Sequence, residues 1–279
     1  MNIKIGIIIV NYNGLKDTLD CLKSIFSQTF KNYDIYVVDN NSKDNIDKLK
    51  EYNIELIQLR KNVGFSAANN VGARKAISNN CNYLLFLNND TILDKNCIEN
   101  LVTNISENCV LSPIMFYFYN KNEIWYSGGH FNSYGIPIHN TTTDESYNDF
   151  ITGCCFLISS DLFLNVGFWD ERYFLYWEDA DYSKRLDNKG VSIKVIDSAI
   201  LYHKVSKTTG GSRSPLMRYY QIRNKLLFLH DYSFGIRSKI RLYLTLLYNI
   251  VKPKYFIYVL FAYIDFKCNL FGKTNRFNY

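Results

Sequence analysis

Acidic residues and one histidine stand at positions typical of catalytic or metal-binding side chains. Asp39 follows directly after a short apolar run, and Asp90 ends the tripeptide Asn88-Asn-Asp90 that follows another. Glu178 and Asp179 begin a segment with helical periodicity, and His203, one of only four histidines, precedes a loop of Gly, Ser and Thr. Carboxylates bind hard divalent cations or accept protons, and an imidazole can complete a metal site with mixed O and N ligands. These residue types favour acid–base or metal-assisted chemistry.

Most of these residues also have a structural interpretation. Asp is a common turn residue, which fits Asp90 alone, and a lone histidine is more often structural than a ligand. The helix dipole stabilises carboxylates in a first turn, and this is sufficient to explain Asp181. Glu178 and Asp179 differ because the residues before them suit the stacking of a sugar ring while a carboxylate removes a hydroxyl proton. These preceding aromatic residues are Tyr173, Tyr176 and Trp177.

Short apolar runs alternate with helical periods over the first hundred residues. Because continuous apolar runs are typical of strands buried on both faces, this alternation predicts an α/β fold with a parallel sheet and right-handed crossovers. Ligands of such sheets bind beyond the carboxyl ends of the strands. We expect strands at 5–10, 35–38, 54–59 and 83–87, and helices at 15–26, 65–77 and 93–105.

The loops after the predicted strands are polar and contain neither G-x-G-x-x-G nor G-x-x-x-x-G-K-[ST]. An ordinary dinucleotide fold and a P-loop NTPase are therefore disfavoured, and a nucleotide would be held differently. Asp39 could accept a hydrogen bond from a pyrimidine N–H, and Asn11 and Asn13 could contact the base or ribose, although an Asx turn explains this loop nearly as well.

The rest of the chain predicts further elements with less regular spacing. We expect hairpins covering one side of the sheet over 110–137, and a strand at 151–158. A helix should run from about 177 to 188, followed by a strand at 191–196. Tail helices are expected near 216–229, 236–251 and 255–270.

Composition excludes several classes of protein. The 279 residues are 47% hydrophobic and 21% charged, which is typical of a globular protein and not of a disordered one. No uncharged apolar stretch reaches the roughly 18 residues of a membrane span, so a polytopic membrane protein is not expected. Seven scattered cysteines without a C-x-x-C pair argue against a disulfide framework or structural zinc site and favour the reducing cytoplasm.

The C-terminal tail is basic and aromatic. From Lys204 onward the chain has fourteen Lys or Arg and two Asp, and sixteen Phe or Tyr follow Ser214. Amphipathic helices of this kind suit an anionic membrane surface. The alternatives are aromatic packing of a C-terminal subdomain or a homodimer contact. A nucleic-acid partner is possible from charge alone but is not expected.

Six short motifs follow one another along the chain. They are Val10-Asn-Tyr-Asn-Gly14, Val38-Asp-Asn-Asn-Ser42, Asn62-Val-Gly-Phe65 with Asn69, Asn70 and Gly72, Leu87-Asn-Asn-Asp90, Thr152-Gly-Cys-Cys155, and Gly167-Phe-Trp-Asp-Glu171 with Tyr176-Trp-Glu-Asp179. In this order the motifs resemble those of family 2 glycosyltransferases of the GT-A fold, in particular the rhamnosyltransferase-like branch that includes galactofuranosyltransferase-like enzymes. The resemblance covers about Ile3 to Gly211.

The resemblance implies roles for individual residues. Asp90 matches the metal-binding residue of the family's Asp-x-Asp element, in which Asn88 replaces the first Asp, and His203 falls where related enzymes supply a second ligand for Mg²⁺ or Mn²⁺. Asp179 matches the general base. The remaining expectations are Glu178, Tyr176 and Trp177 in the acceptor pocket, Asp39 on the nucleotide base, and Asn11, Asn13, Asn41, Asn62, Gly64, Asn88 and Asn89 around the nucleotide sugar.

The expected function is inverting transfer of a sugar, with rhamnose as the first candidate, from a UDP- or dTDP-sugar to a glycan or polyprenyl-diphosphate-linked acceptor. We expect a GT-A domain at 1–213, with its nucleotide-sugar half at about 1–108 and its acceptor half at about 109–213. A helical segment at 214–279 would bind the inner face of the cell membrane or support oligomerisation. The alternative is a catalytically silent sugar-nucleotide-binding or glycan-binding subunit. A nucleotidyltransferase is disfavoured because 11–15 is not a basic Gly-rich loop.

Overall fold

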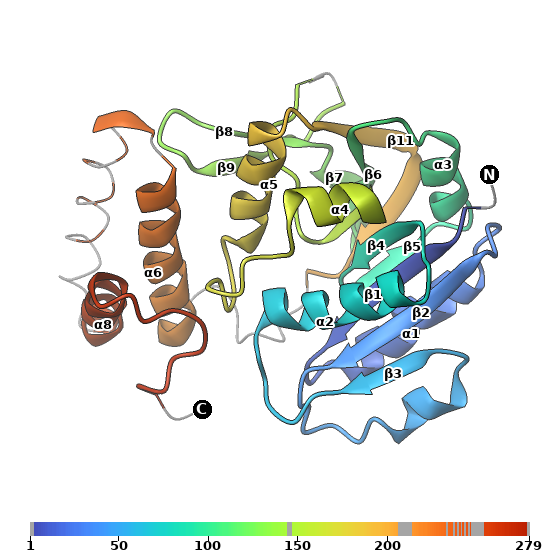
Figure 1. Ribbon diagram of the computed structural model, residues 1–279, viewed down its shortest axis with the longest axis horizontal. Helices are drawn as coiled ribbons and strands as arrows, with labels where there is room; N and C mark the ends of the chain where they lie inside the picture. The colour runs from blue at the N-terminus through green and yellow to red at the C-terminus, as the bar shows by residue number, and fades with distance from the viewer. Residues whose placement is uncertain are drawn as a thin grey trace.

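The computed structural model describes residues 3–143, 147–205, 214–232, 234–236 and 254–277, with single residues at 238, 240, 242, 244 and 246. Its centre is a nine-stranded sheet (Figure 1). The strands of this sheet are β1 (Ile5–Asn11), β2 (Tyr33–Asp39), β3 (Glu55–Gln58), β4 (Tyr83–Leu87), β5 (Thr91–Leu93), β6 (Cys109–Tyr117), β7 (Asn120–Tyr126), β10 (Cys155–Ser159) and β11 (Ser192–His203). A separate hairpin pairs β8 (Gly129–Phe131) with β9 (Pro137–His139).

The strand order is β3-β2-β1-β4-β10-β6-β11-β5, with β7 paired to β6. The first four strands are mutually parallel, and β10 runs antiparallel to both β4 and β6. The carboxyl ends of β1, β2 and β4 therefore meet at one edge, which brings together the loops predicted to hold a nucleotide. The α/β class is confirmed.

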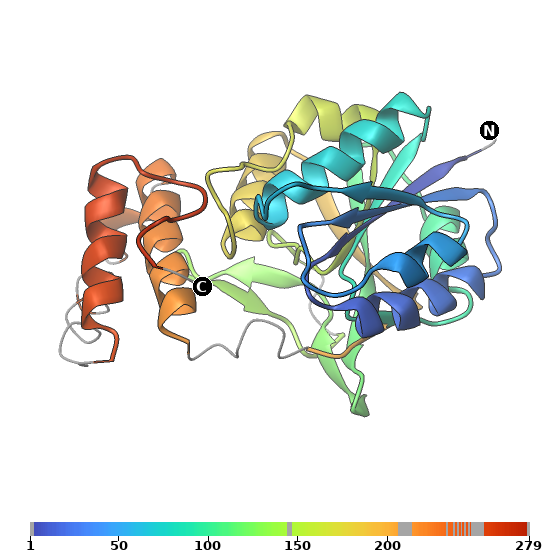
Figure 2. The same ribbon diagram turned by 90° about the horizontal axis from the view of Figure 1, so that it is seen from below.

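Helices cover both faces of the sheet (Figure 2). On one face, Ile7 and Ile9 pack with α1 (Leu15–Phe26) and α3 (Cys97–Thr103), whereas Ile8 faces the opposite side with α2 (Phe65–Ser78), α4 (Ser160–Val166) and α5 (Glu178–Asn188). This alternation follows from the two-residue period of a strand. The remaining elements are the 3-10 helix η1 (Asp47–Glu51), α6 (Pro215–Asp231) and α8 (Phe256–Lys267).

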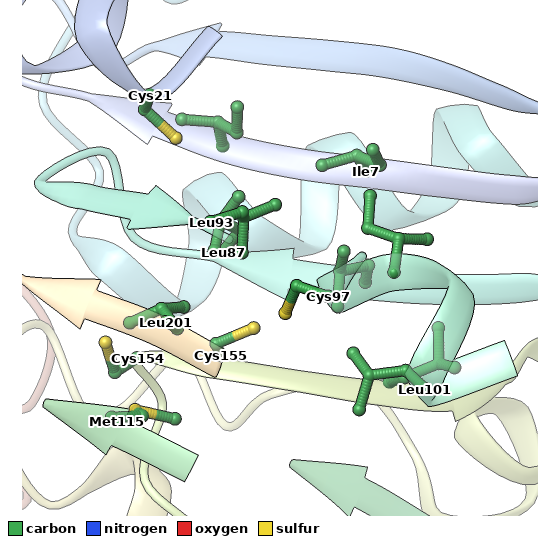
Figure 3. Packing of buried hydrophobic residues seen from close by; sticks show 14 of the residues in the cluster. Ile7, Cys21, Leu87, Leu93, Cys97, Leu101, Met115, Cys154, Cys155 and Leu201 are labelled. Atoms are coloured by element: carbon green, nitrogen blue, oxygen red, sulfur yellow. The ribbon is translucent and has the colours of Figure 1, made fainter. Parts of the chain in front are cut away.

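Cysteines fill the core as small hydrophobic residues. Figure 3 shows four of them among Ile, Leu and Met side chains of the first face. Six of the seven cysteines are buried, all seven are free thiols, and Cys268 is exposed. Burial raises the pKa of the buried Cys21, Cys154 and Cys155 thiols, which keeps them protonated and unreactive.

Several predicted elements were wrong in extent or position. The helix expected at 93–105 begins only at Cys97, because residues 91–93 form β5. The segment 110–137 was expected to form hairpins that cover the sheet. Instead, most of β6 comes from this segment and is a strand of the sheet itself, between β10 and β11. The strand at 191–196 continues to His203, and the short helix α4, capped by Ser159 Oγ on the Leu162 N–H at 3.2 Å, was not predicted.

The C-terminal helices α6 and α8 pack together beside the main sheet domain (Figures 1 and 2). The predicted helix at 236–251 lies largely outside the described residues. The boundary near residue 213 stays a prediction. Across it, Phe228 of α6 stacks on Phe131 of β8 with ring centroids 5.6 Å apart. Within the described part of the chain, no helix has the length and apolar character needed to cross a membrane.

Candidate active site

Asn11 organises the first edge of the site at the end of β1. Its side chain is fully buried, donates from Nδ2 to Asp39 Oδ1 at 2.8 Å, and accepts at Oδ1 from the Thr18 hydroxyl at 2.8 Å. The other oxygen of Asp39 accepts from the Ser42 N–H at 3.1 Å. These bonds fix the Asp39 carboxylate, and because each oxygen has a second lone pair, it can still accept a bond from a ligand N–H.

Asn40, which was not among the predicted site residues, holds the next loop in place. It is buried, donates to Asn62 Oδ1 at 3.0 Å and the Gly64 carbonyl at 3.2 Å, and accepts from the Val63 N–H at 2.9 Å. The neighbouring Asn41 is exposed, with a left-handed φ of 63°. The Asx-turn chemistry was visible in the sequence, but which Asn side chain points inward was not.

Gly64 links the predicted nucleotide-sugar half to the predicted acceptor half. Its φ is 93°, and a Cβ at this position would lie 2.5 Å from the Phe174 carbonyl oxygen, so only glycine fits. The same carbonyl accepts the Phe65 N–H at 2.9 Å. The loop after β3 is therefore packed directly on the segment that precedes α5.

Asn13 and Tyr12 follow Asn11 at the open end of β1. Asn13 has a φ of 52° and accepts the Lys43 N–H at 2.7 Å, which links the two loops. Tyr12 is 41% exposed, so its ring is available to stack on a flat ligand at this edge. Tyr12 was not among the predicted site residues, although an aromatic residue between two asparagines at a strand end is a usable signal.

Asn88 and Asn89 take different positions after β4. Asn89 donates to the Thr18 hydroxyl at 3.0 Å and so ties this loop to α1. Asn88 donates its backbone N–H to the Cys154 carbonyl at 2.8 Å. Both are partly exposed at the sheet edge, and their contact with a nucleotide sugar stays a prediction.

Asp90 and His203 meet across the pair formed by β5 and β11, where Thr91 lies opposite His203. Asp90 Oδ1 is 3.2 Å from His203 Nε2, and each residue is less than a tenth exposed. The Trp125 ring packs edge-on against the imidazole with centroids 4.3 Å apart, and His203 Nδ1 is buried without a hydrogen-bond partner.

The donor set of Asp90 and His203 fits a hard divalent cation. Two ligands at about 2.0–2.1 Å from one Mg²⁺ lie roughly 3 Å apart when adjacent in an octahedron, close to the 3.2 Å between Oδ1 and Nε2. No third His, Cys, Asp or Glu joins the pair among the residues that the structure describes. Substrate phosphate and water oxygens would have to complete the coordination of a bound ion.

Asp179 lies in the first turn of α5 with its carboxylate oriented by backbone donors. Oδ1 accepts the Ala180 N–H at 2.9 Å, and Oδ2 accepts the Gly153 N–H at 3.4 Å. Burial raises the pKa of the Asp179 carboxyl to about 6, an effect that these N–H groups partly offset. Such a group is ionised at neutral pH and is a stronger base than an ordinary carboxylate.

Glu178 has a different environment from its neighbour. It is 8% exposed, and its Oε2 is buried without a hydrogen-bond partner. Burial, reinforced by the charge of Asp179, raises the pKa of the Glu178 carboxyl well above its usual range. A protonated Glu178 can donate a hydrogen bond but cannot serve as the base.

Gly153 and Cys154 connect Asp179 to the Asp90 loop. The Gly153 N–H donates to the Asp179 carboxylate, and the Cys154 carbonyl accepts the N–H of Asn88, which lies two residues before Asp90. Burial is the main reason that the pKa of the Cys154 thiol is raised, and the negative charges of both Asp90 and Asp179 add to it. The sheet therefore brings the predicted metal ligands and the predicted base to the same region.

Tyr176 and Trp177 precede α5 in an uncommon conformation. Their φ angles are 69° and 73°, the left-handed region that aromatic residues rarely adopt and that costs roughly 1–3 kcal/mol per residue. The Tyr176 hydroxyl lies 3.2 Å from Met217 Sδ, and Trp177 packs on Phe228 with centroids 5.2 Å apart. Both side chains contact α6, and their predicted role in acceptor binding stays a prediction.

Comparison with known proteins identifies the family. The family model described as "Glycosyl transferase family 2" matches residues 6–167, more than half of the chain. The chain belongs to glycosyl transferase family 2. The matched range includes the Asn11, Asp39 and Asp90 loops and ends before Asp179 and His203, so the roles of the latter two depend on the geometry.

Relatives of this transferase include the dTDP-rhamnosyl transferase RfbF of Shigella flexneri. The two are 26% identical over 254 residues, which is 86% of this chain and 85% of the relative. The N-acetylglucosaminyl-diphospho-decaprenol L-rhamnosyltransferase of Mycobacterium tuberculosis is 35% identical over 86 residues, 30% of this chain and 27% of the relative. The expected resemblance to rhamnosyltransferases is confirmed.

A solved structure shares the fold of this transferase at low sequence identity. GalNAc-T7, determined with UDP, GalNAc and Mn²⁺, superposes with a TM-score of 0.67 at 17% identity and matches 86% of this chain. The match spans 53%, about half, of the GalNAc-T7 chain. The predicted GT-A fold is confirmed.

Proposed function

We propose that this transferase moves a sugar, with rhamnose as the first candidate, from a UDP- or dTDP-sugar to a hydroxyl group with inversion of configuration. The observation that carries the proposal is the Asp179 carboxylate, which lies in the first turn of α5, is oriented by two backbone N–H groups and has a pKa raised to about 6. The relationship to RfbF supports dTDP-rhamnose as a donor, and the UDP complex of GalNAc-T7 supports testing UDP-sugars as well.

In the proposed reaction, Asp179 accepts the proton of the acceptor hydroxyl. The hydroxyl oxygen attacks the anomeric carbon opposite the diphosphate, the glycosidic bond forms, and the bond from carbon to the diphosphate oxygen breaks. Because attack and departure occur on opposite faces, the configuration inverts and no covalent enzyme intermediate is needed. Glu178, held neutral by burial, would donate a hydrogen bond in the acceptor pocket, and Trp177 would line that pocket.

We assign Asp90 and His203 to a divalent cation, Mg²⁺ or Mn²⁺. When bound there, the ion would neutralise charge that develops on the departing diphosphate. The Mn²⁺ in the GalNAc-T7 complex supports this assignment, as does the distance of 3.2 Å between the two donor atoms. Asp39, held by Asn11 and Ser42, would accept a bond from the pyrimidine ring N–H of the nucleotide.

The acceptor is proposed to be a glycan or a polyprenyl-diphosphate-linked sugar of bacterial cell-surface polysaccharide synthesis. The mycobacterial relative, whose name describes a diphospho-decaprenol substrate, supports a lipid-linked acceptor. We place the protein in the cytoplasm, peripheral on the inner face of the membrane. Apolar residues on the outer side of α8 support this placement, since Phe256, Ile257, Leu260 and Tyr263 are each at least 36% exposed.

A catalytically silent sugar-nucleotide-binding or glycan-binding subunit is the second candidate, because Asn88 replaces a carboxylate of the Asp-x-Asp element. A panel of UDP- and dTDP-sugars, incubated with the protein and Mg²⁺ or Mn²⁺, tests both. Release of UDP or dTDP from at least one sugar, lost in Asp179→Asn, supports the transferase. Nucleotide binding by calorimetry without turnover on any sugar, with or without added glycan acceptors, supports the silent subunit.

A further inference from the structure

The segment immediately before the proposed base has an unusual backbone conformation and is contacted by α6, a helix that is distant from it in the sequence. Tyr176 and Trp177 are consecutive aromatic residues with left-handed φ angles, and Glu178 follows at once as the first residue of α5. In both overall views, the yellow segment between α4 and α5 extends toward α6 (Figures 1 and 2). A conformation that the residues themselves disfavour needs contacts from outside the segment.

Asn224 of α6 makes the most direct of these contacts. It is fully buried, and its Nδ2 donates to the carbonyl oxygens of Leu175 and Tyr176, each at 2.9 Å. One amide group therefore fixes two successive peptide planes. These planes set the direction in which the chain enters α5 and thus the place of Asp179.

Arg223 determines which way the Asn224 amide points. The Arg223 Nε donates to Asn224 Oδ1 at 3.1 Å, and a guanidinium cannot accept a hydrogen bond. The oxygen must therefore face Arg223 and the nitrogen must face the two carbonyls. Arg223 is itself 1% exposed and packs against the rings of Tyr219 and Tyr220, at 5.3 and 5.1 Å from their centroids.

Other turns of α6 contact the same segment. Met217 Sδ lies 3.2 Å from the Tyr176 hydroxyl, and the Phe228 ring packs against Trp177. Because these contacts lie on both sides of Asn224 along α6, the helix supports the segment over several turns. These contacts tie α6 to the segment that precedes Asp179.

We infer that Asn224, oriented by Arg223, is a positioning residue for transfer: it holds the peptides before α5 in their left-handed geometry and so places the Asp179 carboxylate against the acceptor hydroxyl. The inference rests on the proposed role of Asp179. It assigns no contact with the nucleotide to Asn224, so loss of the amide should lower turnover and leave nucleotide binding intact.

The test replaces Asn224 by Asp, which has the same size but no N–H donor for the carbonyls. Turnover should fall about tenfold, as expected from the loss of two hydrogen bonds, on whichever nucleotide sugar of the panel the wild type uses. Affinity for the corresponding UDP or dTDP should change less than about twofold. Hydrogen–deuterium exchange should rise in the peptide covering 173–181. If the buried Asp prevents folding, Asn224→Ser replaces it in the test, because Ser is neutral and can donate one bond. Its turnover should fall by less than about tenfold but stay below that of the wild type.

Asn32→Asp is the matched control, because Asn32 Nδ2 donates to the Ile3 carbonyl at 2.7 Å at the amino end of β1, away from the site. It should leave both turnover and exchange at 173–181 unchanged. Wild-type turnover and exchange in folded Asn224→Asp or Asn224→Ser would overturn the inference. Asp179→Asn, measured in parallel, separates the two ideas: its retained activity would reject the base, whereas exchange at 173–181 reports on Asn224 regardless of which carboxylate is the base.

Discussion

The carboxylate of Asp90 and the imidazole of His203 lie 3.2 Å apart, between atoms Oδ1 and Nε2, although one follows β4 and the other ends β11. The antiparallel pairing of β5 with β11 produces this contact, with Thr91 opposite His203. A mixed carboxylate–imidazole pair, enclosed on one side by Trp125, has the donor chemistry of a divalent metal site.

If both residues bind one ion, Asp90→Ala and His203→Ala should each raise the Mg²⁺ or Mn²⁺ concentration needed for half-maximal turnover by about tenfold or more. The double variant should be little worse than the more damaging single one, because ligands of one ion are not additive. The control is Asp94→Ala, which removes an exposed carboxylate next to β5. Full wild-type activity in excess chelator would reject the metal assignment.

Asp39→Asn should weaken binding of both UDP and dTDP by roughly 10- to 100-fold, since a hydrogen bond to a charged acceptor contributes about 1.5–3 kcal/mol. Isothermal titration calorimetry measures this change, and the melting temperature shows whether the fold is destabilised by the loss of one of the two carboxylate oxygens that accept from Asn11 and the Ser42 N–H. Asp47→Asn in η1, where the carboxylate is exposed, provides the comparison. Unchanged nucleotide affinity would remove Asp39 from the base-binding role.

Glu178→Gln should retain turnover within about a factor of three, because Gln mimics the protonated carboxyl, whereas loss of a general base costs roughly 10²–10⁴. Burial raises the pKa of Asp179 to about 6, so activity should rise as the pH increases through about 6 and Asp179 ionises. This acidic limb should persist in Glu178→Gln and in the control Glu171→Gln, measured as turnover against pH. If turnover of Glu178→Gln fell by roughly 10²–10⁴ instead, Glu178 would be the better candidate for the general base.

Ile257→Glu on α8 should reduce flotation with anionic vesicles by about tenfold, since it removes apolar contact and adds repulsion from the lipid headgroups. Ile257 is 42% exposed. The matched control is Leu164→Glu on α4, which replaces a residue that is 49% exposed on another helix and should leave flotation unchanged. Binding that is equal for neutral vesicles, or unchanged in Ile257→Glu, would contradict the membrane proposal. A dimer that dissociates in this variant would support the homodimer contact instead.

Elements with a local signal could be predicted from the sequence. The strand 83–87 and the helix 15–26 match β4 and α1 because their apolar spacing is itself the signal. β5 is only three residues long and next to a helix, so it has too few residues to show a period. The place of β6 inside the sheet depends on pairing with β10 and β11, which are distant in the chain.

The candidate site shows the same limit. Motif residues such as Asp39, Asp90 and Asp179 could be selected by type and position after strands or at a helix start. Asn40 and Asn224 could not, because their importance comes from which backbone groups they meet after folding. The basic and aromatic composition of the tail indicated a surface helix, so it did not predict that the Asn224 amide is buried.

The proposed reaction depends on Asp179, which removes the proton of the acceptor hydroxyl. The most direct measurement is the turnover of Asp179→Asn on the best nucleotide sugar, with its affinity for the free nucleotide determined on the same preparation. We predict a loss of roughly 10²–10⁴ in turnover with nearly unchanged nucleotide affinity, since the base acts on the acceptor and not on the donor. Retention of more than about a third of wild-type turnover would contradict the assignment, because the loss would fall far below that of a general base.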